Sequence, residues 1–347
     1  MGTKLAKKKK SSKSNSKLKG QEINNGKEKI EEEDEKSNKN NILYNSFNIN
    51  QKKLMIKITY HTYHVLSLCI LDDGRLVSSS IDKQIIIYNK KTYKPDLIIK
   101  EFNDWISCII KLKRNILASC SYDSYIKLFK IKDNNYEILQ ILKHWGAVKK
   151  IIELKNTNLA SCSDDKSIIL FQKENSKYEK KYEISTRAAC FSLVQTKDNE
   201  ICYLEKFHYY EYYYNIIFYN INEKTIKKEI NTENTAGGLG IFNMITKDLL
   251  IYSSENAINI INVNQYKIIR KIEIPNSKYH YGFCKLNKNI FLTTDSYGMI
   301  NQWEIRDDNI YLISTKEKAH ERLIYALINM GNGKIASCAA DNSVKIW

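Results

Sequence analysis

The sequence predicts an all-β fold assembled from seven copies of one repeat. From about residue 53 onward, short runs of β-branched and aromatic residues alternate with polar turns, which is typical of many short strands. The segment "ASCAADNSVKIW" at 336–347 also has near copies at 118–129 ("ASCSYDSYIKLF") and 160–171 ("ASCSDDKSIILF"). Self-similarity at a fixed period indicates units that stack to bury a common core.

Four copies of the repeat keep the same internal spacing without drift. In each copy, an aliphatic residue is followed 17 residues later by a turn Asp and 6 residues after that by an aromatic residue. These triplets are Val65–Asp82–Tyr88, Ile106–Asp123–Phe129, Val148–Asp165–Phe171 and Ile324–Asp341–Trp347. Three weaker copies at 199–220, 247–263 and 288–304 bring the total to seven, and the first of these carries an insertion.

The first 50 residues have a different composition. Lys, Ser, Asn and Glu dominate, and too little apolar surface is present to drive folding. The net charge of the chain is +16, and residues 1–20 contain eight lysines and no acidic residue. The sequence therefore predicts a disordered basic tail and linker over 1–50 and a folded repeat domain over 53–347.

His, Ser, Asp and Trp recur at fixed places in the repeat, and on these residues the chain resembles the WD-repeat β-propeller family over about 53–347. The resemblance implies blades of four strands, a to d, each held by a hydrogen-bonded His–Asp–Ser–Trp network. A buried Asp and His need such partners. The residues that carry this structural role are His320, Ser337, Asp341 and Trp347; His61, Ser78 and Asp82 with Tyr88 for Trp; His144, Ser161 and Asp165 with Phe171; and Asp123, in a copy that has Phe102 in the His place.

The last copy ends on Trp347 with no fourth strand after it. The segment "KLMIKITYH" at 53–61 precedes the first copy, and its sequence resembles that of a d strand. We expect it to complete the seventh blade and close the ring, which removes a sheet edge that would otherwise bind other chains. The alternative is a truncated sequence, which would leave 53–61 without a partner. The predicted fold is thus a seven-bladed β-propeller closed by an N-terminal strand, with a disordered basic tail.

Motifs for catalysis or metal binding do not stand out. The sequence contains no P-loop, HExxH, EF-hand loop or zinc-ligand spacing. The eight cysteines include no CxxC pair, and Cys120, Cys162 and Cys338 share one repeat position that suits a small core residue. We expect no catalytic residue, no metal and no cofactor. No secretory signal or transmembrane segment is expected either.

The first residues, "MGTKLAKKKK", resemble N-myristoylated polybasic membrane anchors, although Ala6 stands where the acylation pattern favours Ser or Thr. The resemblance implies lipidation of Gly2. One myristoyl chain binds membranes only marginally, and nearby lysines add attraction to an anionic leaflet. The lysines expected to contribute are Lys4, Lys7, Lys8, Lys9, Lys10 and Lys13. This favours a cytoplasmic protein held peripherally at a membrane; the alternatives are a nuclear localisation signal at 7–10 and an inert tail.

Partner binding is expected on the propeller face that carries the d–a loops and b–c turns. Aromatic residues concentrate at binding hot spots, and Arg can pair with acidic or phosphorylated peptides. The candidate residues are Trp105, Trp145, Arg187, Tyr209, Tyr210, Tyr212, Tyr213 and Arg322. The predicted function is a non-catalytic protein-interaction scaffold, a monomeric propeller within a larger complex.

Two alternative functions remain open from the sequence. The "WEIR" segment at 303–306 resembles the ending found in WD-repeat substrate receptors of cullin-type ubiquitin ligases, in which Arg306 would contact the adaptor. An RNA- or chromatin-associated propeller is the other alternative. Nucleic acid is the less expected partner, because half of the net charge lies in the tail rather than on a folded face.

Overall fold

A computed structural model describes residues 47–347 except 209–211, 233–241, 255, 275–279 and 307–308. The chain divides into two units, residues 1–47 and 48–347, and every strand that the structure describes lies in the second unit. No helix among the described residues is long and apolar enough to cross a membrane.

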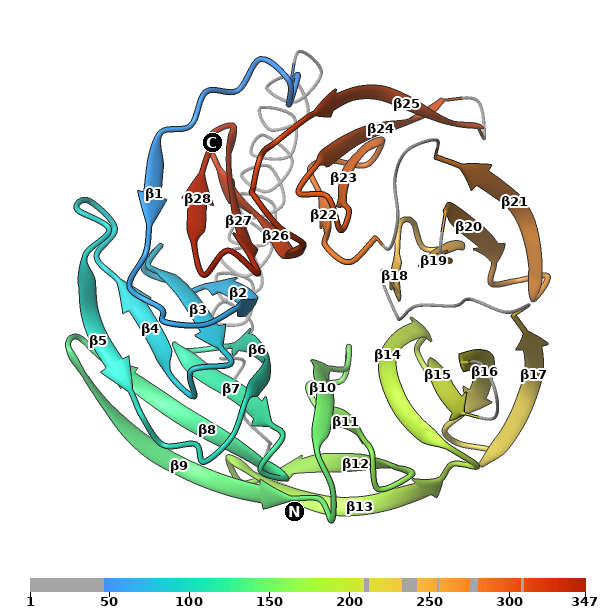
Figure 1. The fold of residues 1–347 in the computed structure, drawn as a ribbon. Helices are drawn as coiled ribbons and strands as arrows, with labels where there is room; N and C mark the ends of the chain where they lie inside the picture. Colours follow the sequence, from blue (N-terminus) through green and yellow to red (C-terminus); the bar gives the residue numbers. More distant parts are fainter. Residues whose placement is uncertain (1–46, 209–211, 233–241, 255, 275–279, 307–308) are drawn as a thin grey trace, which may run out of the picture. The chain divides into compact units, whose positions relative to one another are not determined.

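The second unit is a ring of seven four-stranded antiparallel sheets, or blades (Figure 1). Blade 1 comprises β2 (Val65–Ile70), β3 (Leu76–Ser80), β4 (Ile85–Tyr88) and β5 (Pro95–Ile99). Blade 2 comprises β6 (Ile106–Leu112), β7 (Ile116–Ser121), β8 (Tyr125–Lys132) and β9 (Asn135–Lys143). Blade 3 comprises β10 (Val148–Glu153), β11 (Leu159–Ser163), β12 (Ser167–Glu174) and β13 (Lys177–Ser185). Blade 4 comprises β14 (Ala189–Lys197), β15 (Glu200–His208), β16 (Tyr212–Asn220) and β17 (Thr225–Asn231).

The remaining blades follow the same plan. Blade 5 comprises β18 (Phe242–Met244), β19 (Leu249–Ser253), β20 (Ala257–Asn262) and β21 (Lys267–Glu273). Blade 6 comprises β22 (Phe283–Lys285), β23 (Ile290–Thr294), β24 (Ile300–Arg306) and β25 (Asn309–Lys316). Blade 7 comprises β26 (Ile324–Gly331), β27 (Lys334–Ala339), β28 (Val344–Ile346) and β1 (Ile56–Ile58). The first strand of each blade, a, lies toward the centre of the ring and the last strand, d, forms its rim (Figure 1). The predicted seven-bladed all-β fold is confirmed.

The ring closes through the N-terminal strand. β1 lies antiparallel to β28, with Ile56 opposite Ile346 and Ile58 opposite Val344. The Met55 N–H donates to the Ile346 carbonyl at 2.8 Å and extends the ladder by one bond. The expectation that residues 53–61 complete the seventh blade is therefore confirmed.

The segment before β1 also contacts blade 6. Ile49 is fully buried, and its N–H donates to the Gln302 side-chain oxygen on β24 at 2.8 Å. The Lys316 ammonium at the end of β25 donates to the Lys52 carbonyl at 2.6 Å. Residues 48–58 thus join blade 6 to blade 7 in addition to pairing with β28.

The hydrophobic core lies between consecutive blades. Ile85 and Ile87 of blade 1 pack in one cluster with Ile109 and Phe129 of blade 2. The same arrangement recurs around the ring and includes Ile58 of the closing strand. A single blade cannot cover its own apolar faces, so each depends on its neighbours for burial.

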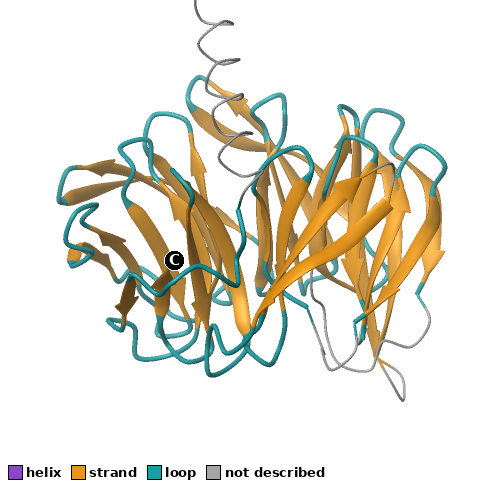
Figure 2. Ribbon diagram, turned by 90° about the horizontal axis from the view of Figure 1, so that it is seen from above, coloured by secondary structure: helices purple, strands orange, loops and turns teal. Residues whose placement is uncertain are grey.

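Figure 2, in which strands are orange and loops teal, shows loops at both ends of the strands. We call the end that carries the d–a loops and b–c turns the top face. The residue after the turn-Asp place has a positive φ in five b–c turns: Lys83, Ser124, Lys166, Gly298 and Asn342. In four of them the preceding Asp accepts the N–H two residues later, at 2.9–3.1 Å. This local bond holds a left-handed turn that Lys and Ser rarely adopt unaided.

Candidate functional site

Blade 7 contains the complete predicted network. The Trp347 indole N–H donates to Ser337 Oγ at 2.9 Å, and the Ser337 hydroxyl lies 2.7 Å from His320 Nε2. His320 Nδ1 lies 2.8 Å from Asp341 Oδ2. The Nδ1–H group of His320 donates to the carboxylate, and Nε2 then accepts the Ser337 hydroxyl proton. The four side chains of this network are therefore joined by an unbroken series of hydrogen bonds.

The electrostatics of this network suit a structural role. Burial lowers the pKa of His320, and the ring is therefore neutral near pH 7. Burial alone would raise the pKa of Asp341, but the hydrogen bonds from His320 and Ser343 outweigh it and lower that pKa. His320 and Ser337 are buried. The network holds the top of the blade together.

Blade 1 repeats this arrangement with a phenol in place of the indole. His61 Nδ1 lies 2.8 Å from Asp82 Oδ2, and His61 Nε2 lies 2.7 Å from Ser78 Oγ. The Tyr88 hydroxyl is 2.8 Å from Ser78 Oγ. Tyr88 therefore substitutes for Trp without interrupting the hydrogen-bonded network.

Blade 3 has a shorter network. His144 Nδ1 lies 2.9 Å from Asp165 Oδ2, and His144 Nε2 lies 2.7 Å from Ser161 Oγ. Phe171 fills the aromatic position but has no donor for Ser161. The hydrogen-bonded network of blade 3 is therefore one bond shorter than the networks of blades 1 and 7.

Blade 2 replaces the histidine with an aromatic contact. Asp123 accepts the Asn103 backbone N–H at 2.9 Å, so its carboxylate is satisfied without His. Phe102 packs edge-on against Phe129, with ring centroids 6.1 Å apart, and the Lys127 ammonium lies 5.0 Å from the Phe102 centroid.

Blade 4 uses an ion cluster that includes Arg187, one of the residues predicted to bind a partner. The Arg187 backbone N–H donates to Glu205 Oε1 at 3.0 Å, and its guanidinium donates to Glu205 Oε2 at 2.8 Å. The same guanidinium donates to Glu229 Oε1 at 2.8 Å. Glu205 is buried. A buried carboxylate needs this charged partner, so Arg187 is engaged within the blade.

The top face carries an aromatic hollow of about 630 Å³ between blades 7, 1 and 2. Its aromatic lining consists of Tyr63 and His64 from the loop before β2, Trp105 from the loop before β6, and Tyr325 on β26. The His64 and Tyr325 rings lie 6.0 Å apart, and Trp105 packs on Tyr122 at 5.2 Å. Tyr63 and Trp105 remain 60% and 42% exposed, so their rings are available to a ligand.

Two cations lie beside this aromatic hollow. Lys83 lines the hollow, and Arg322 is exposed near His64. Burial lowers the pKa of His64, and the positive charge of Arg322 lowers it further. Neither Lys83 nor Arg322 forms an ion pair with a residue that the structure describes. An apolar hollow beside two unpaired cations can accommodate a bulky apolar group that neighbours an anion.

The other predicted partner residues lie elsewhere. Trp145 is 86% exposed and outside the hollow, with the Lys143 ammonium 4.9 Å from its ring centroid. Arg306 ends β24, is exposed, and pairs with Glu304. Tyr212 and Tyr213 begin β16. The side chains of these two tyrosines, all of Tyr209 and Tyr210, Gly2, and the tail lysines Lys4, Lys7, Lys8, Lys9, Lys10 and Lys13 lie outside the described residues.

Tyr63, His64 and Tyr325 were not among the predicted site residues. A signal for His64 was present, because His64 and Trp105 both stand three residues after the His place of their repeats. No comparable signal marks Tyr325, which reaches the hollow from the opposite end of the sequence.

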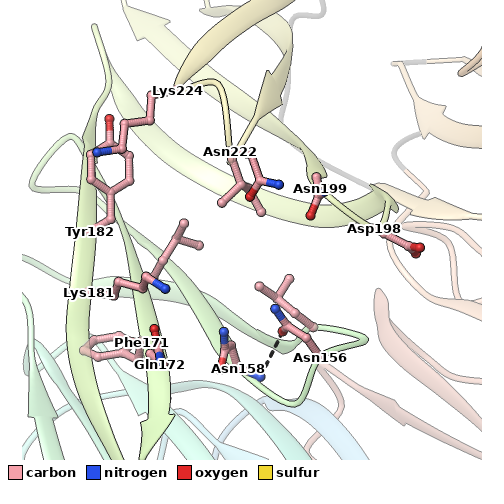
Figure 3. A pocket seen from close by; sticks show the side chains of 13 residues that line it. Asn156, Asn158, Phe171, Gln172, Lys181, Tyr182, Asp198, Asn199, Asn222 and Lys224 are labelled. Carbon is pink, nitrogen blue, oxygen red and sulfur yellow. Dashed lines mark hydrogen bonds between the residues drawn. The ribbon is translucent and has the colours of Figure 1, made fainter.

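A second cavity, of about 280 Å³, lies between blades 3 and 4 (Figure 3). Tyr182 and Lys224 lie together on one side of it, with the Lys224 ammonium 4.7 Å from the Tyr182 ring centroid, and Asn156 and Asn158 lie on another side (Figure 3). Asn156 Oδ1 accepts the Asn158 N–H at 3.2 Å, and Asn158 Oδ1 accepts the Lys173 N–H at 3.0 Å. The side-chain oxygens of these two amides are thus engaged with the backbone of blade 3.

Within the described ranges, no group of three or more His, Cys, Asp or Glu residues is arranged to hold a metal ion. The protein family described as "WD domain, G-beta repeat" matches residues 52–89 and 312–347, which contain β1–β4 and β26–β28 of blades 1 and 7. No curated protein matches the chain. The two matches, the His–Asp–Ser networks and the seven four-stranded blades support the WD-repeat propeller family, and the chain is a seven-bladed β-propeller with WD40 repeats.

Proposed function

We propose that this propeller is a non-catalytic scaffold that binds a protein segment in the aromatic hollow of its top face. A WD40 propeller fits a protein-interaction scaffold in general. The observation that carries the specific proposal is the hollow itself, where four aromatic side chains from three blades surround a space of about 630 Å³. Aromatic side chains in such a setting supply large contact areas at low cost in conformational entropy.

The chemistry of the hollow selects a class of ligand. Tyr63, Trp105 and Tyr325 offer apolar faces, whereas Lys83 and Arg322 offer positive charge without an anionic partner among the described residues. A peptide with a bulky apolar residue next to Asp, Glu or a phosphorylated side chain matches both features.

This assignment is tested with an array of short peptides that vary the apolar and the acidic position. The full chain is compared with Trp105→Ala and Arg322→Ala, and Trp145→Ala is the matched control, because Trp145 is exposed but lies outside the hollow. We expect Trp105→Ala to lower affinity at least tenfold, since truncating a hot-spot aromatic costs about 2 kcal/mol or more. Arg322→Ala should abolish the preference for acidic peptides. Equal losses for Trp105→Ala and Trp145→Ala, or peptide binding unaffected by either, would overturn the placement in the hollow.

We further propose that the basic tail attaches the scaffold peripherally to the cytoplasmic face of a membrane. The support is the sequence of residues 1–20, with Gly2 after the initiator Met and eight lysines. Mass spectrometry of the mature N-terminus should show a myristoyl group on Gly2, and Gly2→Ala should move the protein from membrane to cytosol. A Lys7–Lys10→Gln form should keep the acyl group and still bind more weakly to vesicles that contain phosphatidylserine. An unacylated N-terminus with both forms in the cytosol or nucleus would refute the anchor and leave the peptide proposal untouched.

A further inference from the structure

Two cysteines lie directly opposite each other at the centre of blade 2. Cys108 on β6 is the register partner of Cys120 on β7. Opposite residues in an antiparallel pair have Cα atoms about 4.5–5.5 Å apart, which falls within the range that a disulfide spans. Strand pairing therefore presents the two thiols to each other.

Among the strand pairs that the structure describes at this position of the repeat, only blade 2 has two cysteines opposite each other. The same pair is Ser67 and Ser79 in blade 1, Lys150 and Cys162 in blade 3, Ser192 and Leu204 in blade 4, and Ala326 and Cys338 in blade 7. Cys162 and Cys338 thus occupy the b-strand position of Cys120 but have no cysteine opposite in the ladder. The thiol of Cys190 lies close enough to that of Cys162 to interact with it, so Cys338 is the internal control for the pair.

The surroundings of Cys108 differ from those of the other cysteines. Seven cysteines are buried, whereas Cys108 is partly exposed. Interaction with the Cys120 thiol and the nearby Lys150 ammonium together outweigh burial and lower the pKa of Cys108. Burial and the Cys108 charge raise the pKa of Cys120, which keeps its proton. Cys108 is thus the thiol of the pair that ionises more readily, and Ser107 Oγ lies 3.3 Å from Cys120 Sγ.

We propose that Cys108 and Cys120 form a redox-active dithiol that hydrogen peroxide converts to a cross-strand disulfide. The Cys108 thiolate attacks one peroxide oxygen and, with one proton, yields Cys108 sulfenic acid and water. The Cys120 sulfur then attacks the sulfenic sulfur and displaces a second water, so that two thiols and one peroxide give one disulfide and two waters. Two electrons pass from sulfur to peroxide. A thiol reductant reverses the change.

The test uses the full chain in its folded state. Folded protein is treated with peroxide, then denatured, alkylated, digested with trypsin without reductant and analysed by mass spectrometry. Trypsin cleaves after Lys111 and Arg114, between the two cysteines, so the disulfide links two separate peptides. We expect this linked pair to appear with peroxide and vanish with dithiothreitol, while Cys338 is recovered as an alkylated free thiol.

Two variants separate the steps. Cys120→Ser removes the resolving thiol, so Cys108 should accumulate as sulfenic acid that dimedone traps. Cys108→Ser should leave Cys120 as inert as Cys338 toward both peroxide and alkylation. Thermal melting first establishes that each variant is folded, and the experiment on the unmodified protein stands without them. Free Cys108 and Cys120 after peroxide treatment, alkylation of Cys108 no faster than that of Cys338, or a disulfide that joins other cysteines would each overturn the proposal.

Discussion

His280 occupies a position that an apolar side chain fills in five other blades. The equivalent residues, each three positions before the a-strand residue that pairs with the network position of the b strand, are Val65, Ile106, Val148, Cys190 and Ile324. His280 is fully buried, and neither ring nitrogen has a hydrogen-bond partner among the described residues. Burial lowers its pKa to about 4. Blade 6 therefore holds a neutral imidazole that interacts with its surroundings mainly by packing.

Replacing His280 by Val should stabilise the propeller and reduce its sensitivity to acid. An unfolded chain takes up a proton on this ring below its ordinary pKa of 6.5, whereas the folded chain resists until about pH 4, so stability falls as pH decreases through that interval. From pH 7 to 5.5 the loss from this residue is about 1 kcal/mol. Urea unfolding of both proteins at these two pH values measures it. An identical pH dependence of the two proteins would show that His280 is not buried as a neutral ring.

At the scale of single elements, the c strands of blades 1 and 3 form a natural comparison. Tyr88 at the end of β4 and Phe171 on β12 occupy the same repeat position and differ in one hydroxyl group. Tyr88 completes its network at Ser78, whereas Ser161 has no donor from Phe171.

Phe171→Tyr should therefore stabilise blade 3, and Tyr88→Phe should destabilise blade 1. The expected changes in the free energy of unfolding are about +1 and −1 kcal/mol, the net value of one hydrogen bond. Chemical denaturation of the two variants against the parent gives both numbers. Destabilisation by both substitutions would mean that the space beside Ser161 does not admit a hydroxyl group.

The sequence predicted these strands and networks more completely than it predicted the site. Fixed spacing locates His61, His144 and His320, because each of these networks forms within one short stretch of the chain. The contact of Arg187, a predicted partner-binding residue, with Glu229 joins residues 42 positions apart and has no counterpart in the repeat pattern. The aromatic hollow combines Trp105 with Tyr325 from the last blade, and no local pattern encodes that approach. Contacts that recur in several repeats are visible in the sequence, whereas a contact found in a single blade and contacts between distant blades are not.

At the scale of the whole molecule, the closing strand decides whether the ring is intact. Ile58 is buried and packs with residues of blades 7 and 1, whereas Ile98 on the rim of blade 1 is 42% exposed. Ile58→Ala should lower the free energy of unfolding by about 2–4 kcal/mol. Ile98→Ala, the same change at an exposed rim position, should alter it by about 0.5 kcal/mol or less.

Thermal unfolding measures both effects, and native mass spectrometry detects a second consequence. Loss of β1 from the sheet exposes the backbone edge of β28, which can then pair with another molecule. Ile58→Ala should therefore form dimers or larger species that Ile98→Ala does not. Equal stability of the two variants would indicate that blade 7 is held by its three C-terminal strands alone.

The pairing of β1 with β28 also constrains how the protein is made. Ile58 and Val344 are partners although 286 residues separate them. At about 5–20 residues per second, a ribosome needs about 15–60 s to deliver the second partner after the first. During that interval the closing segment, with its buried Ile49 and Ile58, has neither β28 nor blade 6 to cover it. Newly made chains should therefore depend on a chaperone that shields residues 48–58 until the last strand leaves the exit tunnel.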